Sequence, residues 1–316
     1  MKLPLALTAA AAIMLTSCNH KEFCYDHPHG VTLRVVYDWS EAPDANPAGM
    51  CVFFYNIDVE MAPKRFDFNN IEGGEIELTP GRYRVMTYNN DTEASLFASI
   101  SDFDIHYVYT REGNILEPIY GNTMPLPPRS DGTEDERVVI TPDMIWGCTE
   151  IEVTVTGVTD QVITLYPHDM LCHYSYEVRN VKNLKHVSQM SGAISGMAPA
   201  MYIAGETLHT EPVTLPFGAA SDGASTIRGE FLTFGHHEEV DKPHRMSFYM
   251  VMDDGSKFSF TSASNLDVTD QVHSAPDRRR VHIIIDGLEL PTPIENGSGF
   301  KPEVDNWQDV KEDIIL

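Results

Sequence analysis

The sequence predicts an all-β protein made of two tandem β-sandwich domains. Short runs of β-favouring residues alternate between apolar and polar positions, and turn formers such as Ala42-Pro43-Asp44-Ala45-Asn46-Pro47 separate them. Apolar residues at helical spacing are nearly absent. Without residues 1–17 the chain has 316 − 17 = 299 residues, which is enough for two domains of about 100–200 residues each.

The first 18 residues form a leader that ends at a cysteine. Lys2 precedes an apolar run that closes on Leu15-Thr16-Ser17-Cys18. This is the pattern of a cleaved signal peptide, and the run is too short for a membrane-spanning helix, which takes roughly 20 residues. The ending resembles a bacterial lipobox, so we expect residues 1–17 to be removed and Cys18 to carry lipid chains that hold the protein on a membrane. An ordinary leader is the alternative.

Residues 18–30 are expected to be a lipidated, polar tether, because proline and glycine discourage regular structure there. The first sandwich is expected over residues 31–147. Strand 137–140 should close it, and the chain should cross to the second domain near Trp146-Gly147. The expected strands are 31–38, 50–55, 65–68, 75–78, 82–88 and 137–140.

The second sandwich is expected over residues 148–290. Its first strand, 149–156, alternates without a fault and should place Ile151, Val153 and Val155 on one face. Asp254-Gly255 predicts a tight hairpin turn, whereas residues 191–196 suit either a strand edge or a loop. The further expected strands are 161–166, 174–181, 201–204, 212–215, 227–234, 245–252, 257–261 and 280–285.

The tail, residues 291–316, carries spaced apolar residues after a segment with several prolines and glycines. One interpretation is a final edge strand that closes the second sandwich. The other is a strand that is offered to the sheet edge of a partner. The residues expected to form this strand are Val304, Trp307, Val310, Ile314 and Leu316.

The charge of the chain excludes one class of partner. There are 47 acidic against 22 basic residues, a net charge of −25 that becomes −26 when Lys2 is lost with the leader. Such a surface repels phosphate backbones, so no nucleic acid partner is expected. Cys24, Cys51, Cys148 and Cys172 lack the paired spacing of a metal site, and their disulfide state stays open.

No catalytic, metal or cofactor site is predicted. The sequence contains neither a nucleophile elbow nor a glycine-rich phosphate loop nor H-E-x-x-H. A metal site was considered for Cys24-Tyr25-Asp26-His27-Pro28-His29 and for His236-His237-Glu238-Glu239 with His244. Because no third ligand stands at a fixed spacing, solvent-facing histidines are the favoured interpretation.

Aromatic residues suggest a second function, the binding of glycans. Trp39, Tyr55, Tyr107, Tyr109 and Trp146 can supply stacking platforms, although sandwich cores use the same residues. The only basic run, Arg278-Arg279-Arg280, suits a blunted strand edge, a salt bridge to the acidic surface, or a site for an Arg-specific protease.

Taken together, these residues resemble the fimbrillin-like surface lipoproteins of Bacteroidales. The resemblance is carried by the lipobox at Cys18 and the segments 24–30, 35–39 with 42–47, 65–68 and 81–93, and more weakly by 299–307. It covers nearly the whole chain and is strongest over residues 18–93.

This resemblance implies two transthyretin-like, Greek-key sandwiches displayed at the outer membrane by a lipid anchor. It implies a non-enzymatic structural, anchoring or adhesive subunit of fimbriae that binds other subunits by strand addition, with a host or glycan ligand as a further partner. In the family, shaft subunits lose an N-terminal strand to an Arg-specific protease. Arg34 lies inside the expected first strand, which favours an anchor or accessory subunit.

Overall fold

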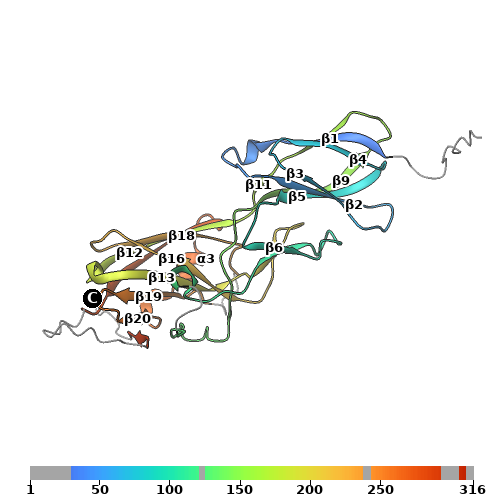
Figure 1. The fold of residues 1–316 in the computed structure, drawn as a ribbon. Coiled ribbons are helices and arrows are strands. Elements are labelled where there is room, and N and C mark those ends of the chain that lie inside the picture. The colour runs from blue at the N-terminus through green and yellow to red at the C-terminus, as the bar shows by residue number, and fades with distance from the viewer. Residues whose placement is uncertain (1–29, 121–124, 238–242, 293–305, 311–316) are drawn as a thin grey trace, which may run out of the picture.

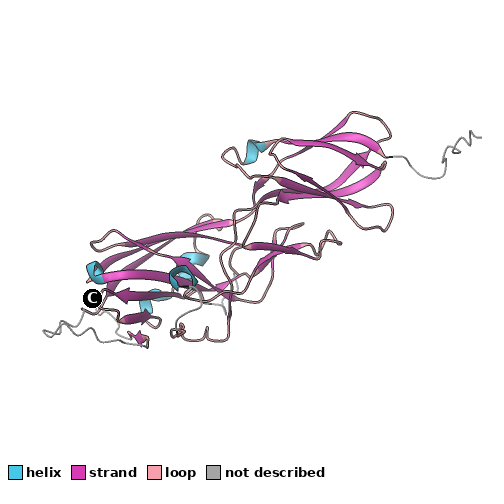
Figure 2. Ribbon diagram, viewed as in Figure 1, coloured by secondary structure: helices cyan, strands magenta, loops and turns pink. Residues whose placement is uncertain are grey.

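The computed structural model describes residues 30–120, 125–237, 243–292 and 306–310 of the chain. Strands dominate it (Figure 2), and they form an elongated molecule of two lobes (Figure 1). The all-β class expected from the sequence is confirmed. Among the described residues, no helix has the length and apolar character needed to cross a membrane.

The N-lobe, residues 31–92 and 146–169, is a sandwich of two sheets. In the smaller sheet β1 lies between β10, which runs parallel to it, and β4, which runs antiparallel. The larger sheet has the order β11–β9–β5–β2–β3. The strands are β1 (Val31–Tyr37), β2 (Met50–Asn56), β3 (Lys64–Phe68), β4 (Gly73–Leu78), β5 (Gly81–Asn89), β9 (Trp146–Val155), β10 (Gln161–Leu165) and β11 (His168–Asp169).

The C-lobe, residues 111–120, 125–140, 172–199, 209–237, 243–292 and 306–310, is a larger sandwich whose described strands form two sheets. One sheet has the order β17–β18–β12–β21 and the other β22–β20–β19–β13–β16–β8. The strands are β8 (Arg137–Val138), β12 (Cys172–Lys182), β13 (Val187–Met197), β16 (Val213–Gly218), β17 (Ala220–Ser221), β18 (Ile227–Thr233), β19 (Met246–Met252), β20 (Lys257–Phe260), β21 (Arg280–Glu289) and β22 (Gln308–Asp309).

A third, four-stranded sheet joins the lobes and is called the bridging sheet. Its order is β15–β14–β7–β6, and Figure 1 places β6 between the two lobes. One face packs on the outer side of the larger N-lobe sheet in a buried cluster, the bridging core, which contains Phe53, Val108, Met201 and Phe234. The strands are β6 (Ser95–Ala98), β7 (Tyr107–Thr110), β14 (Ala200–Tyr202) and β15 (Thr207–Leu208).

Burial on both faces explains the uninterrupted apolar run in β2. Met50, Val52 and Phe54 point into the N-lobe core, whereas Cys51 and Phe53 point into the bridging core. A strand that is covered on both sides needs no polar face. The bridging core is therefore shared by residues that the sequence assigned to different domains.

The expected boundary near Trp146-Gly147 does not separate the two cores. β9 pairs with β5, and β10 pairs with β1, so residues 146–169 return to the N-lobe. β8, expected to close the first domain, pairs instead with β16 of the C-lobe. Alternation predicts that a segment is a strand but does not say which distant strand it joins.

A β-bulge also alters the first strand of the expected second domain. Val153 pairs with Tyr83, but the next pair along the ladder joins Glu150 to Val85, so β9 has one extra residue there. The extra residue reverses the side-chain alternation. Val155 is buried and Ile151 is 76% exposed, so the prediction that they share a face is wrong.

Two local expectations in the C-lobe can be compared directly. Residues 191–196 lie in β13, which pairs on both sides with β16 and β19 and so is neither an edge nor a loop. The hairpin between β19 and β20 is present, with Gly255 at φ +88° closing a three-residue loop.

Short helical segments are η1 (Trp39–Glu41), α2 (Glu117–Tyr120), η2 (Leu184–His186), η3 (Ser264–Leu266) and α3 (Thr269–His273).

Candidate functional site

The C-terminal segment lies on an edge of the six-stranded sheet. Gln308 and Asp309 pair in parallel with the middle of β20, and the N–H of Val310 donates to the carbonyl of Ser259 at 2.9 Å. The Asp309 carboxylate accepts a hydrogen bond from the hydroxyl of Thr261 at 2.8 Å. The ladder covers two positions, so the segment closes this edge with few main-chain bonds.

Two of the five predicted tail residues can be placed. Trp307 contacts Tyr249 with ring centroids 5.8 Å apart, and its Nε1 donates to the carbonyl of Pro125 at 2.8 Å. Val310 packs against the C-lobe core. Pairing with a partner's sheet stays a prediction. Of the site residues predicted from the sequence, Cys18, Val304, Ile314 and Leu316 lie outside the described part of the chain.

The long edge strand β21 is covered by side-chain amides. The Gln271 amide donates to the carbonyl of Ile284 at 2.9 Å and accepts from its N–H at 2.8 Å. The Asn265 amide donates to the carbonyls of Asp286 and Gly287 at 2.9 and 2.8 Å. These contacts imitate those of a neighbouring strand, so they protect this edge from pairing with another chain.

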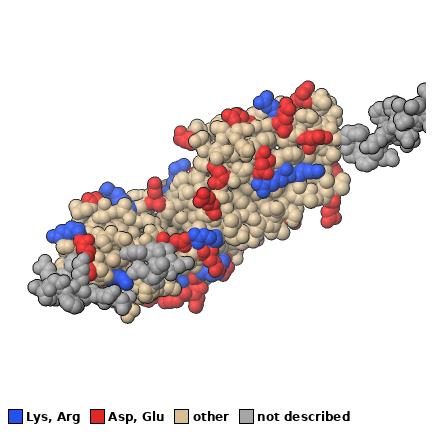
Figure 3. Space-filling view, viewed as in Figure 1, with Lys and Arg blue, Asp and Glu red and all other residues tan. Residues whose placement is uncertain are grey.

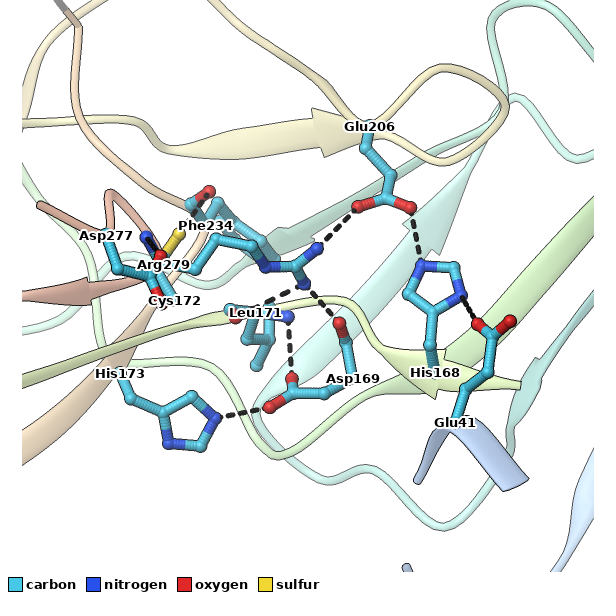
Figure 4. A network of polar contacts seen from close by, with 10 residues as sticks. All are labelled: Glu41, His168, Asp169, Leu171, Cys172, His173, Glu206, Phe234, Asp277 and Arg279. Atoms are coloured by element: carbon cyan, nitrogen blue, oxygen red, sulfur yellow. Dashed lines mark hydrogen bonds and ion pairs between the residues drawn. The ribbon is translucent and has the colours of Figure 1, made fainter. Parts of the chain in front are cut away.

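Arg279 fixes the connection from the N-lobe to the C-lobe (Figure 4). Its guanidinium donates to the main-chain carbonyls of Asp169 and Leu171 and forms an ion pair with Glu206 at 3.2 Å. The Asp169 carboxylate also lies 2.6 Å from Nε2 of His173. Of the three interpretations of the basic run 278–280, the contacts of Arg279 therefore support the salt bridge.

His168 extends this network to η1 of the N-lobe (Figure 4). Its Nε2 lies 2.6 Å from Glu206, and its Nδ1 lies 3.9 Å from Glu41 in η1. The hydrogen bond with Glu206 raises the pKa of His168 above its ordinary value, although burial opposes the shift. Burial also acts against ionisation of Glu206, but its contacts with His168 and Arg279 hold its pKa below the ordinary value.

A second histidine, His106, lies fully buried in the region of the bridging core. Its Nδ1 is 2.7 Å from the Tyr55 hydroxyl, and its Nε2 is 3.1 Å from the Tyr88 hydroxyl. Because the Tyr55 hydroxyl donates to the carbonyl of Ile100, Nδ1 carries the proton and Nε2 accepts from Tyr88. Burial lowers the pKa of His106 to about 4, so the ring is neutral at pH 7.

Three further histidines meet in the C-lobe. The rings of His236, His244 and His273 have centroids 5.0–5.5 Å apart, and Nε2 of His244 lies 3.1 Å from Nε2 of His273. His236 contacts the Tyr174 hydroxyl at 2.5 Å, and burial lowers its pKa to about 4. The sequence interpretation of His236 as solvent-facing is wrong, since it is 8% exposed.

The structure gives no support to a metal site within its described part. No group of three or more ligand side chains is arranged there to hold an ion. The other candidates, Cys24, Asp26, His27, His29, Glu238 and Glu239, lie outside the described residues.

The described cysteines behave as small buried hydrophobic residues. Cys51, Cys148 and Cys172 are free thiols, and burial raises the pKa of Cys51 and of Cys148 to about 12. Such thiols are poor nucleophiles at neutral pH. Cys24 lies outside the described residues.

The aromatic candidates for glycan binding divide into two groups. Trp39 packs on the N-lobe core and donates to the carbonyl of Ile71 at 2.8 Å, and Tyr55 is buried. Trp146 is partly buried in β9. Tyr107 and Tyr109 differ, because both are partly exposed on the outer face of the bridging sheet.

Charged side chains of both signs are interspersed over the visible face of the two lobes (Figure 3). Several form exposed ion pairs, such as Arg82 with Asp58 at 2.6 Å and Lys182 with Glu289 at 2.6 Å. Exposed pairs of this kind contribute little to stability, because water and salt screen them. They keep the surface polar and do not define a site.

A family model described as a domain of unknown function, DUF5119, matches residues 17–218, which is more than half of the chain. The chain belongs to the DUF5119 family. This DUF5119 chain is 26% identical over 246 residues to a Bacteroides ovatus protein named as a fimbrium anchoring subunit, Fim4B. The alignment covers 75% of the DUF5119 chain and 66% of that relative, just under two thirds of its length. The resemblance to fimbrillin-like proteins is confirmed.

Two solved structures of bacterial surface proteins are similar to this chain. A Bacteroides ovatus protein described as an adhesin has a TM-score of 0.61 and 20% identity to the DUF5119 chain, covering 89% of this chain and 100% of that one. The fimbrial anchor protein Mfa2 of Porphyromonas gingivalis is more distant, with a TM-score of 0.47, 12% identity, and coverages of 81% and 90%. The first likeness shows a shared fold.

Proposed function

We propose that this protein is a non-enzymatic, surface-exposed lipoprotein that anchors or joins fimbrial subunits by β-strand addition. The relative named as a fimbrium anchoring subunit supports this assignment. The observation that carries the mechanism is the two-position parallel ladder of β22 on the edge strand β20. A partner strand that pairs along all of β20 makes more bonds than the chain's own tail does.

The bonding at the other long edge directs this exchange to β20. At β21 the side chains of Gln271 and Asn265 already occupy main-chain groups of the strand. At β20 the tail pairs with the strand at two register positions, Phe258 and Ser259. Release of residues 306–310 therefore exposes a strand edge and, at the same time, frees a strand for a partner's sheet.

A disulfide that locks the tail on its own sheet should prevent joining. Ser259 and Asp309 are register partners whose side chains face each other, with Oγ 3.4 Å from Oδ1, so Ser259→Cys with Asp309→Cys suits a disulfide. We expect the oxidised variant to lose at least tenfold in co-purification with fimbrial subunits from the native cell envelope. Reduction of the same protein should restore it.

Deletion of residues 304–316 gives an independent test, because it removes the tail that the disulfide holds in place. Loss of co-purification with an unchanged unfolding temperature would support the tail as the joining element. Undiminished partner binding by both the locked and the deleted protein would show that the tail is not involved. The reduced form of the double-cysteine variant serves as the matched control.

Membrane attachment through Cys18 is the second part of the proposal. We expect Cys18 to be the first residue of the mature protein and to carry lipid chains. Each CH₂ group of these chains that is buried in the membrane contributes about 0.8 kcal/mol to membrane binding. Peptide mass spectrometry on protein from its native membrane measures this directly. Cys18→Ser should move the protein to the soluble fraction, and an unmodified Cys18 in membrane-bound protein would contradict the proposal.

A further inference from the structure

The bridging sheet presents an aromatic outer face that the joining mechanism does not use. Side chains alternate between the two faces of a strand, and in β7 Val108 and Thr110 are buried while Tyr107 and Tyr109 are partly exposed. Tyr202 of β14 stands opposite Tyr107 in the register. Tyr109 stands opposite Ala200 in the register, and both residues line the hollow described below.

The rings on this face hold one another in place. Tyr107 has centroid distances of 5.6 Å to Tyr109 and 6.0 Å to Tyr202. His209 stacks on Tyr202 at 4.3 Å with an interplanar angle of 27° and lies 4.8 Å from Tyr107. Mutual packing fixes the ring orientations before any ligand arrives, which lowers the entropy cost of binding.

A hollow of about 480 Å³ opens beside these rings. This volume falls within the range of small-molecule sites, about 300–1,000 Å³. Its lining combines ring faces with hydrogen-bonding groups at the rim. The lining residues that matter here are Tyr107, Tyr109, Arg137, Pro199, His209 and Glu211.

The charged side chains at the rim of the hollow already form ion pairs with one another. Arg137 forms ion pairs with Glu211 at 3.1 Å and with Glu112 at 3.5 Å. A phosphate or carboxylate ligand would have to compete with both carboxylates for the guanidinium. Burial also lowers the pKa of His209, so its imidazole is neutral. The hollow therefore suits an uncharged ligand that can both donate and accept hydrogen bonds.

One polar atom on this face still lacks a partner. Nε2 of His209 is buried and has no hydrogen-bond partner in the described part of the chain. A buried polar atom of this kind costs free energy unless a water molecule or a ligand group satisfies it. A hydroxyl bound beside the ring is one such group.

We propose that this hollow binds one or two pyranose units of a neutral glycan. A pyranose has a face of C–H groups that meets the electron-rich face of an aromatic ring, and a rim of hydroxyls that donate and accept hydrogen bonds. Tyr107 and Tyr109, whose rings are tilted by 46° to each other, supply the ring faces, and Arg137, Glu211 and His209 supply the polar rim. This binding is separate from subunit joining and does not depend on it.

The test uses the full mature chain and neutral sugars as probes. Maltose, cellobiose, lactose and methyl mannoside, together with an array of neutral oligosaccharides, are titrated against the parent protein and the variants Tyr107→Ala and Tyr109→Ala. We expect saturable binding of at least one neutral glycan and a loss of at least tenfold in each variant. Tyr166→Ala is the matched control, since Tyr166 is 43% exposed and lies outside this face.

The conservative variant Tyr109→Phe keeps the aromatic ring and should keep most of the glycan binding. If an alanine variant fails to fold, this variant still tests whether the ring is what binds the glycan. Absence of binding to every neutral glycan would overturn the proposal. So would binding that both alanine variants retain, or binding confined to anionic glycans. The locked-tail protein should bind glycan like the parent, which separates this site from the proposed joining function.

Discussion

Replacing Phe53 by alanine is expected to lower the free energy of unfolding by about 3–5 kcal/mol, the usual cost of removing a buried aromatic side chain. Phe53 is 1% exposed in the bridging core and contacts Tyr55, Tyr88 and His106 through its ring. Both lobes contribute residues to this core. We therefore expect the variant to weaken both lobes together, with one unfolding transition at a lower denaturant concentration.

Urea unfolding followed by tryptophan fluorescence and by far-ultraviolet circular dichroism measures this effect. Ile151→Ala is the matched control, because Ile151 is 76% exposed beyond the β-bulge and its loss should change stability by less than about 0.5 kcal/mol. Two separate transitions, of which Phe53→Ala shifts only the first, would show that the lobes unfold independently and that the bridging core does not couple them.

The protein is expected to lose stability as the pH falls from 6.5 to 4. The native pKa of His106 is about 4, whereas an unfolded histidine has a pKa of about 6.5. Between these values the unfolded chain binds a proton that the native chain does not, so unfolding is favoured on acidification. The shift corresponds to about 3 kcal/mol for His106, and His236 acts in the same direction.

Chemical unfolding at pH 7, 5.5 and 4 tests this dependence. His106→Gln removes the titrating group, so we expect a lower stability at pH 7, from the altered contacts with Tyr55 and Tyr88, but a flatter dependence on pH. His282→Gln, a change at an exposed histidine of β21, is the matched control variant. A His106→Gln slope equal to that of the parent would assign the acid sensitivity elsewhere.

Local pattern predicted most of the strands of this fold but not their partners. The runs at 50–55, 82–88 and 227–234 appear as β2, β5 and β18 with ends shifted by at most one residue. The return of β9 and β10 to the N-lobe depends on pairing across about 60–130 residues, for which alternation carries no signal. The bulge at Ile151 escaped prediction because nothing in an evenly alternating segment marks an extra residue.

For the candidate sites, too, local pattern predicted individual residues but not the residues that they contact. Trp307 and Val310 were found from their apolar spacing, but that spacing does not say whose sheet edge they occupy. Tyr107 and Tyr109 were found as aromatics, whereas Tyr202 and His209 complete the face from a segment about 95 residues away. His273 and Gln271 gave no signal, since a single polar residue in a short helix acquires its role only from the strand or ring beside it.

The position of β1 determines how the molecule bears tension. β1 starts at the outer end of one lobe and β20 lies in the other (Figure 1). A pull applied ahead of Val31 acts along β1, which has five register pairs with β10 on one side and six with β4 on the other. Inter-strand hydrogen bonds lie across this direction, so the load shears all of them at once and cannot peel them apart singly. Resistance to forced unfolding is set by the unfolding rate, so β1 is expected to hold a load that is applied at its N-terminal end.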